Sequence, residues 1–263
     1  MSDTFLDATL VGMVHLPPLP GAPRYDGDRA AVRERALADA RALAAGGVDA
    51  VMVENFGDAP FYPDDVPKHV VAEMTALVAA VRAEVDLPVG VNVLRNDAEA
   101  ALSVAAATGA SAIRVNVHAG ARVTDQGVVE GRAHETMRLR ERLDCDASVL
   151  ADVAVKHSTP LGEEDVVHAT HDLVERGLAD AVVVSGAGTG RAIHAGQLSS
   201  VAGAAGAAGV PTFVGSGVTP ETAPGILTVA DGAIVGTALK RDEDPAGPVD
   251  EELVRRLVDN VGE

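Results

Sequence analysis

Short runs of β-branched and small apolar residues alternate with alanine-rich helical segments along the whole chain of 263 residues. Alternation of this kind is typical of a parallel sheet whose strands are joined by crossover helices. The expected strands are residues 9–15, 50–54, 89–94, 112–117, 148–153, 181–185, 212–215 and 233–236. The expected helices are residues 29–45, 68–84, 98–108, 133–143, 163–176, 195–208, 222–229 and 250–261.

Eight strands and eight helices favour closure of the sheet into a barrel, and the chain length is usual for one such domain. A doubly wound open sheet is the alternative, but it would need a glycine-rich turn after the first strand, where this chain reads LPPLPGAP. Glycines precede several strands, whereas the long loops 16–28, 55–67 and 118–132 follow strands. We therefore predict an α/β fold, a single (β/α)8 TIM barrel spanning residues 1–263, with its functional loops at the carboxyl ends of the strands.

The net charge is −18, from 39 acidic and 21 Lys or Arg residues. A surface of this sign disfavours nucleic acid and anionic lipid as partners. The acid excess and the scarcity of lysine are typical of extreme halophiles, so we expect a cytoplasm rich in salt.

The first twenty residues lack a basic leader and no run of eighteen apolar residues occurs, which predicts a cytoplasmic protein without membrane insertion. Cys145 is the single cysteine and excludes an internal disulfide.

Glycines directly follow the last two expected strands. Such turns let backbone N–H groups approach an anion that a side chain would hold away, and successive units of a barrel direct them to one point. The sequence therefore predicts a phosphate site here, next to a helix start. The alternative is that these glycines only make tight turns. The predicted phosphate-binding residues are Gly215, Ser216, Gly217, Gly236 and Thr237.

Polar residues follow most of the other strands and should converge on the same mouth. Asp152, Lys156 and His157 supply a carboxylate, an ammonium and an imidazole within six positions, a set suited to acid–base chemistry. With Glu54 they are the predicted catalytic residues. A buried Asp152–Lys156 ion pair without chemistry, or a Schiff-base lysine, are the alternatives. The predicted substrate-binding residues are His15, Asn92, Asn116, Ser185, Thr189 and Gly190.

Seven collinear motifs cover nearly the whole chain. They are GMVHL at 12–16 with PLPG at 18–21, VENFGDAPF at 53–61, RVNV at 114–117, TDQG at 124–127, VKHS at 155–158, VSG at 184–186 with TG at 189–190, and GSGVTP at 215–220. Together they resemble the BtpA/SgcQ family. The resemblance implies a ribulose-phosphate-binding barrel fold, but it implies little about activity, since members carry labels as different as a factor for photosystem I accumulation and a nucleosidase.

Two functions follow as hypotheses. The first is an enzyme acting on a phosphorylated sugar or a ribosyl or nucleoside compound, by nucleosidase or phosphosugar isomerase chemistry. The second is a non-catalytic biogenesis or stability factor for a larger, photosystem-like assembly. No cofactor and no metal site is predicted. The substrate, the reaction, a metal requirement and association into homo-oligomers are left open by the sequence.

Overall fold

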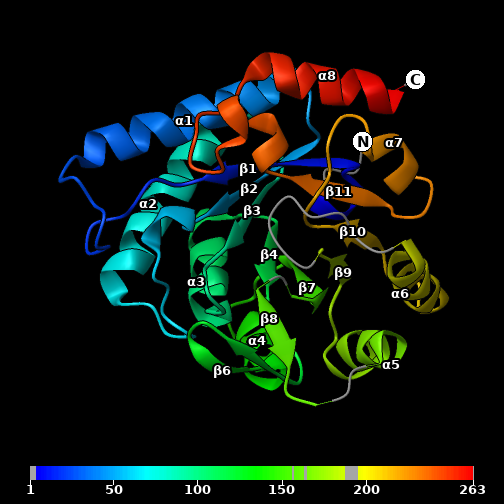
Figure 1. The fold of residues 1–263 in the computed structure, drawn as a ribbon. Coiled ribbons are helices and arrows are strands. Elements are labelled where there is room, and N and C mark those ends of the chain that lie inside the picture. The colour runs from blue at the N-terminus through cyan, green and yellow to red at the C-terminus, as the bar shows by residue number, and fades with distance from the viewer. Residues whose placement is uncertain (1–3, 156, 163–164, 187–194, 263) are drawn as a thin grey trace.

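Eight parallel strands close into a barrel (Figure 1). The structure is a computed structural model that describes residues 4–155, 157–162, 165–186 and 195–262. Around the barrel the order is β1-β2-β3-β4-β7-β9-β10-β11, and β11 pairs with β1. The strands are β1 Leu10–His15, β2 Ala50–Glu54, β3 Val89–Asn92, β4 Ala112–Val115, β7 Ser148–Ala154, β9 Ala181–Val184, β10 Thr212–Val214 and β11 Gly232–Val235. The predicted closed barrel is confirmed.

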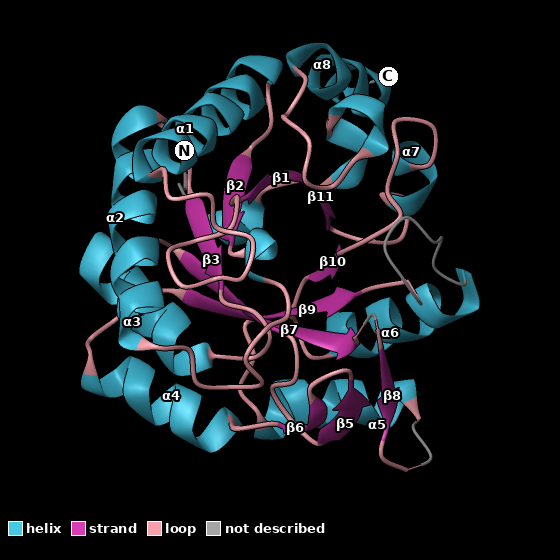
Figure 2. Ribbon diagram, turned by 60° about the vertical axis from the view of Figure 1, so that its left-hand side comes forward, coloured by secondary structure: helices cyan, strands magenta, loops and turns pink. Residues whose placement is uncertain are grey.

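Helices surround the ring of strands on the outside, as Figure 2 shows. Asp28 and Asp97 cap the starts of α1 and α3 by accepting hydrogen bonds from backbone N–H groups, and Gly47 and Gly109 end these helices in the left-handed conformation. No helix within the described residues is long and apolar enough to cross a membrane. The helices are α1 Arg29–Gly46, α2 Lys68–Glu84, α3 Ala98–Thr108, α4 Ala133–Arg142, α5 Val166–His171, α6 Ala195–Ala207, α7 Ala223–Ile226 and α8 Glu251–Gly262.

Apolar side chains fill the barrel interior toward the amino ends of the strands. Phe5, from a 3-10 turn (η1, Phe5–Asp7) ahead of β1, packs there with Phe213 of β10. Glycines make room for both rings, because a Cβ at Gly90 would lie 2.9 Å from Phe5 and one at Gly232 would lie 2.4 Å from Phe213. A second, larger core fills the space between strands and helices. The polar groups of the interior are thereby confined to the carboxyl ends of the strands.

Two segments differ from the sequence-based expectations. Loop 118–132 contains β5 Ala121–Thr124 and β6 Gly127–Glu130, which form an antiparallel sheet with β8 Ser158–Pro160. The expected helix 163–176 is α5 followed by a π-helical turn (η3, Asp172–Arg176), and residues 163–164 lie outside the described residues. The small sheet is built from the segments that follow β4 and β7, and in Figure 2 it lies at the edge of the barrel beside α5.

A buried ion pair joins the last βα unit to the first. Lys240 is fully buried, donates from Nζ to the carbonyl oxygen of Met13 at 3.2 Å, and lies 3.6 Å from Oδ2 of Asp39 in α1. Asp39 also accepts hydrogen bonds from Arg35 Nε and from the backbone N–H of Val249. Burial lowers the pKa of Lys240 to about 8, although the negative charge of Asp39 acts in the other direction and raises it. This pair fixes the backbone of β1 two residues before His15.

We expect Asp39→Asn to destabilise the fold by about 3 kcal/mol, because it leaves the Lys240 ammonium buried without a counterion. Chemical denaturation in molar salt measures the loss. Glu34→Gln is the control, since it removes an exposed partner of Arg41 and should change the free energy of unfolding little. Equal stability of both variants would show that the buried pair contributes nothing.

Candidate active site

The two glycine-rich turns line one cavity at the carboxyl end of the barrel, with a volume of about 110 Å³. One turn follows β10 and the other follows β11, so neighbouring units contribute to it, as the sequence predicted. Four ionisable residues also line this cavity: His15, Glu54 and Arg114 come from other strands, and exposed Glu243 comes from the loop after β11. The predicted phosphate residues that line it are Gly215, Ser216, Gly217, Gly236 and Thr237. We call these five residues the glycine cradle.

The three glycines of the cradle are required for different reasons, one by its backbone conformation and two by close contacts. Gly217 has a φ of +72°, a conformation that residues with a side chain rarely adopt. A Cβ at Gly215 would lie 2.8 Å from Nη2 of Arg114 and from Oγ of Ser185. A Cβ at Gly236 would lie 3.0 Å from the His15 ring. A substitution at Gly217 would therefore strain the backbone as well as the cavity, and it cannot isolate ligand binding.

The cradle is built from loops, and helix ends contribute little to it. The expected helix 222–229 is shorter in the structure, because α7 is a single four-residue piece that begins at Ala223 and ends at Ile226. After Gly236 the chain makes one 3-10 turn (η4, Thr237–Leu239). Pro224 lies in the first turn of α7, the part of a helix in which proline is accepted, so the helix begins after Thr219 as its sequence indicates. Any anion held here would depend on backbone N–H groups and nearby cations.

A buried ion pair lies directly beside the cradle. Arg114 of β4 donates from Nε and Nη2 to the two carboxylate oxygens of Asp152 of β7, each at 2.8 Å. Nη2 also reaches Ser185 Oγ at 3.2 Å, and Asn116 Nδ2 donates to Asp152 at 3.1 Å. Burial lowers the pKa of Arg114, but the charge and hydrogen bonds of Asp152 outweigh it, so the pKa is raised overall. The guanidinium therefore stays charged.

Arg114 is the charged residue of the candidate site that the sequence interpretation did not name. That interpretation offered Lys156 as the ionic partner of Asp152, whereas the described structure pairs Asp152 with Arg114, and Lys156 lies outside the described residues. The sequence does contain a sign of this pair. Arg114 interrupts the apolar strand Ala-Ile-Arg-Val and lies two residues after Ala112, so its side chain points into the barrel interior as that of Ala112 does. A charged residue at such a position needs a buried partner on a neighbouring strand.

Two asparagines extend the polar group: Asn92 is the last residue of β3, and Asn116 directly follows β4. Asn92 donates from Nδ2 to the carbonyl oxygen of Arg114 at 2.9 Å. The Oδ1 atoms of Asn92 and Asn116 are buried and have no hydrogen-bond partner. Arg95 lies near Asp125, Asp152 and Glu54, and burial lowers its pKa. This end of the barrel is therefore rich in buried polar groups, in contrast to the apolar interior beneath.

His15 and Glu54 end the adjacent strands β1 and β2 in register. His15 Nε2 lies 3.8 Å from Oε1 of Glu54, and Nδ1 lies 2.8 Å from the carbonyl oxygen of Pro245. The imidazole stacks on Phe56, with ring centres 4.4 Å apart and planes inclined by 14°. Both ionisable side chains are buried and line the cavity of the cradle.

None of the remaining predicted residues that the structure describes lines the cavity of the cradle. Asn116 and Asp152 line a second cavity of about 350 Å³ between β7, α5 and the small sheet. His157 is exposed, with a φ of +57°, and does not line the cavities described. Lys156, Thr189 and Gly190 fall outside the described residues.

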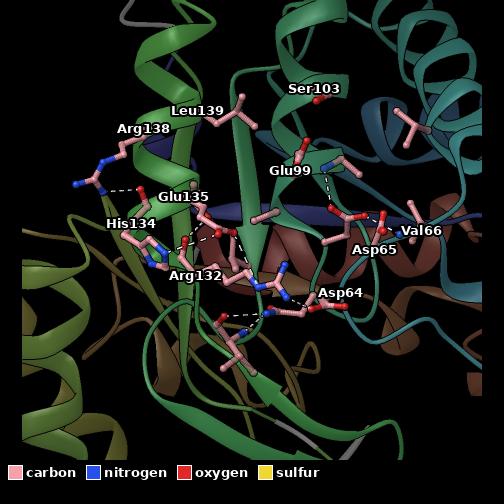
Figure 3. A pocket seen from close by; sticks show the side chains of 18 of the residues that line it. Asp64, Asp65, Val66, Glu99, Ser103, Arg132, His134, Glu135, Arg138 and Leu139 are labelled. Atoms are coloured by element: carbon pink, nitrogen blue, oxygen red, sulfur yellow. Dashed lines mark hydrogen bonds and ion pairs between the residues drawn. The ribbon is translucent and has the colours of Figure 1, made fainter.

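A larger cavity, about 690 Å³, lies on the outside of the barrel between α3 and α4 (Figure 3). Among the charged residues that line it, Arg132 forms an ion pair with Asp64 and lies 3.9 Å from Glu135. Within the described part of the chain, no group of three or more His, Cys, Asp or Glu side chains could hold a metal ion. The mouth of the barrel is thus the better candidate for chemistry, because cradle, imidazole, carboxylate and guanidinium meet there.

The BtpA family model matches residues 6–263. The chain belongs to the BtpA family. An uncharacterized protein of Thermococcus kodakarensis is 51% identical over 250 residues, covering 95% of this chain and 94% of that protein. The photosystem I biogenesis protein BtpA of Synechocystis sp. is 44% identical over 254 residues, covering 97% and 88%. SgcQ of Escherichia coli, named a sgc region protein, is 31% identical and covers 97% and 94%.

Solved structures share the fold of this BtpA-family chain at low sequence identity. Thiamine phosphate pyrophosphorylase from Pyrococcus furiosus superposes with a TM-score of 0.58 and 14% identity, covering 98% of this chain and 96% of that chain. N-(5'-phosphoribosyl)anthranilate isomerase from the same organism gives a TM-score of 0.56 and 13% identity, covering 97% and 98%. These likenesses confirm the TIM-barrel fold.

Proposed function

We propose that this BtpA-family barrel binds and converts a small phosphorylated sugar or ribosyl compound at the carboxyl ends of its strands. One observation carries the proposal: glycine turns from two successive units line the same cavity as an imidazole, a carboxylate and a guanidinium. The turns suit a phosphate, and the three side chains suit proton transfer and charge stabilisation beside it. The names of both solved neighbours refer to phosphorylated compounds, which supports the ligand class.

The contacts separate the roles of the two proposed catalytic carboxylates. Both oxygens of Asp152 are occupied by Arg114 and Asn116, which favours a role in holding the guanidinium beside the cradle. Glu54 lines the cavity itself and is the better group to act on a substrate. A carboxylate in this place can serve nucleosidase or isomerase chemistry, either as a base or as the counterion of a neighbouring imidazole. Assistance by Lys156 or His157 rests on the sequence alone.

A second candidate is a biogenesis factor for a larger assembly. The observation in its favour is the 44% identity to a protein named for photosystem I biogenesis. In that case the cradle would serve as a regulatory ligand site. Ligand binding alone does not separate the two functions, whereas turnover of a bound phosphorylated compound does.

The test of the phosphate site is Thr237→Asp, which adds a carboxylate to the cradle without adding bulk. Wild-type protein should be stabilised by inorganic phosphate or a sugar phosphate in high salt, by about 2.7 kcal/mol at one hundred times the dissociation constant. Thr237→Asp should abolish this stabilisation, because the new charge repels the dianion.

Thr228→Asp is the matched control, since Thr228 is exposed beyond α7 and does not line the cradle cavity. Thermal unfolding with a panel of phosphorylated and unphosphorylated sugars measures all three proteins. Stabilisation by unphosphorylated sugars alone, or equal stabilisation of Thr237→Asp by phosphate, would remove the phosphate site.

A further inference from the structure

The His15 ring is held in one orientation by three contacts. Its face stacks on Phe56, its Nδ1 lies 2.8 Å from the carbonyl oxygen of Pro245, and its edge lies against Gly236. The absence of a side chain at Gly236 allows this approach, because a Cβ there would lie 3.0 Å from Cε1 and 3.2 Å from Nε2. The Nε2 edge of the ring therefore faces the glycine cradle.

The contact with Pro245 determines which nitrogen carries the hydrogen. A carbonyl oxygen can only accept, so Nδ1 must donate its hydrogen to Pro245. In the neutral imidazole, Nε2 then bears the lone pair. An imidazole that is fixed through one nitrogen and presents a lone pair from the other has the geometry of a general base.

Glu54 completes the arrangement. Its Oε1 lies 3.8 Å from Nε2, so its negative charge favours the imidazolium that forms when Nε2 takes a proton. Arg114 lines the same cavity and can balance negative charge that develops on a substrate oxygen. The cavity thus holds a base, a counterion for the protonated base and a cation for the substrate.

We propose that His15 is the catalytic base and acid of this site, acting on a carbonyl-containing sugar phosphate whose phosphate lies in the glycine cradle; the assignment rests on the proposed function. Nε2 takes the proton from the carbon beside the carbonyl, and the C–H bond breaks as the N–H bond forms. The electron pair moves onto the carbonyl oxygen, near Arg114. The carbon that loses its proton carries a hydroxyl group, so the intermediate is an enediolate. The hydroxyl hydrogen passes to the former carbonyl oxygen as a new C=O bond forms at its own carbon, and Nε2 returns its proton to the former carbonyl carbon. The net change is an isomerisation without an oxidant or a reductant.

The probe is bromohydroxyacetone phosphate, which carries an alkylating carbon close to its phosphate. With its phosphate in the cradle, the Nε2 lone pair should displace bromide and form a C–N bond to His15. A Cys145→Ala background removes the single thiol that would compete. Mass spectrometry of the digested protein should locate one label on His15, and inorganic phosphate should protect against it. Exposed His134 is the internal control, because its labelling should not respond to phosphate.

His15→Gln should lose the label yet keep its stabilisation by inorganic phosphate, and His15→Asn serves if the first variant does not fold. A label on Glu54 in place of His15, or no protected label in protein that phosphate does stabilise, would overturn the assignment. Absence of phosphate stabilisation in the wild-type protein would instead overturn the proposed function, and the assignment with it. Thermal unfolding with phosphate therefore distinguishes the two failures.

Discussion

Asp152→Asn is expected to destabilise the folded protein by about 3 to 5 kcal/mol, measured by chemical denaturation in molar salt. The substitution keeps the shape of the side chain but removes its charge. Arg114 is buried, and the two hydrogen bonds that it donates to the Asp152 carboxylate compensate its charge. The guanidinium would remain charged and buried, facing an amide that cannot accept both bonds in the same way.

The double variant Arg114→Met/Asp152→Leu shows how much of the lost stability comes from leaving one charge buried without a partner and how much from losing the ion pair itself. Because both charges are removed together, most of the lost stability should return. Arg132→Met is the control, since it breaks an ion pair of a half-exposed arginine and should have little effect. A loss below about 1 kcal/mol for Asp152→Asn would mean that water reaches Arg114 and that the pair is not buried in solution.

The fold could be predicted from the sequence because its strands are short, apolar and evenly spaced. Residues 50–54, 68–84 and 98–108 were predicted with the bounds that the structure has. Helix ends were visible where a glycine closes the helix, as at Gly47 and Gly109. Prediction failed where tertiary contacts decide, as in the pairing of β5 with β8, which brings residues 122–124 and 158–160 together.

The candidate site was predictable only in part, for a similar reason. Glycines after strands and polar residues at strand ends point to the mouth of any barrel, which is why Glu54 and the cradle could be named in advance. Arg114 lies inside a strand, and its role depends on a partner 38 positions away. Lys240 lies in a loop, and the residues around it in the sequence do not indicate that it is buried in an ion pair with Asp39. Pairings of this kind are set by the closed barrel and not by spacing along the chain.

Removing salt is expected to unfold this protein. Its net charge of −18 comes from 39 acids against 21 bases, so the folded state brings many like charges together. At about 1 M salt the screening length is roughly 3 Å, whereas it is roughly 10 Å at 0.1 M and 30 Å at 0.01 M. Repulsion between neighbouring surface acids should therefore rise steeply on dilution, and ion pairs such as Arg255 with Glu251 are too few to offset it.

Circular dichroism during dialysis from molar potassium chloride into dilute buffer measures the transition, with sucrose as a control that lacks screening ions. Glu141→Gln/Asp144→Asn/Asp146→Asn reduces the net charge from −18 to −15 at three exposed acids within six residues. Because each amide removes a repelling charge without changing the core, this variant should stay folded to a lower salt concentration than the wild type. A full native spectrum of the wild-type protein in dilute buffer, or identical salt midpoints for the two proteins, would show that the acid excess does not limit stability.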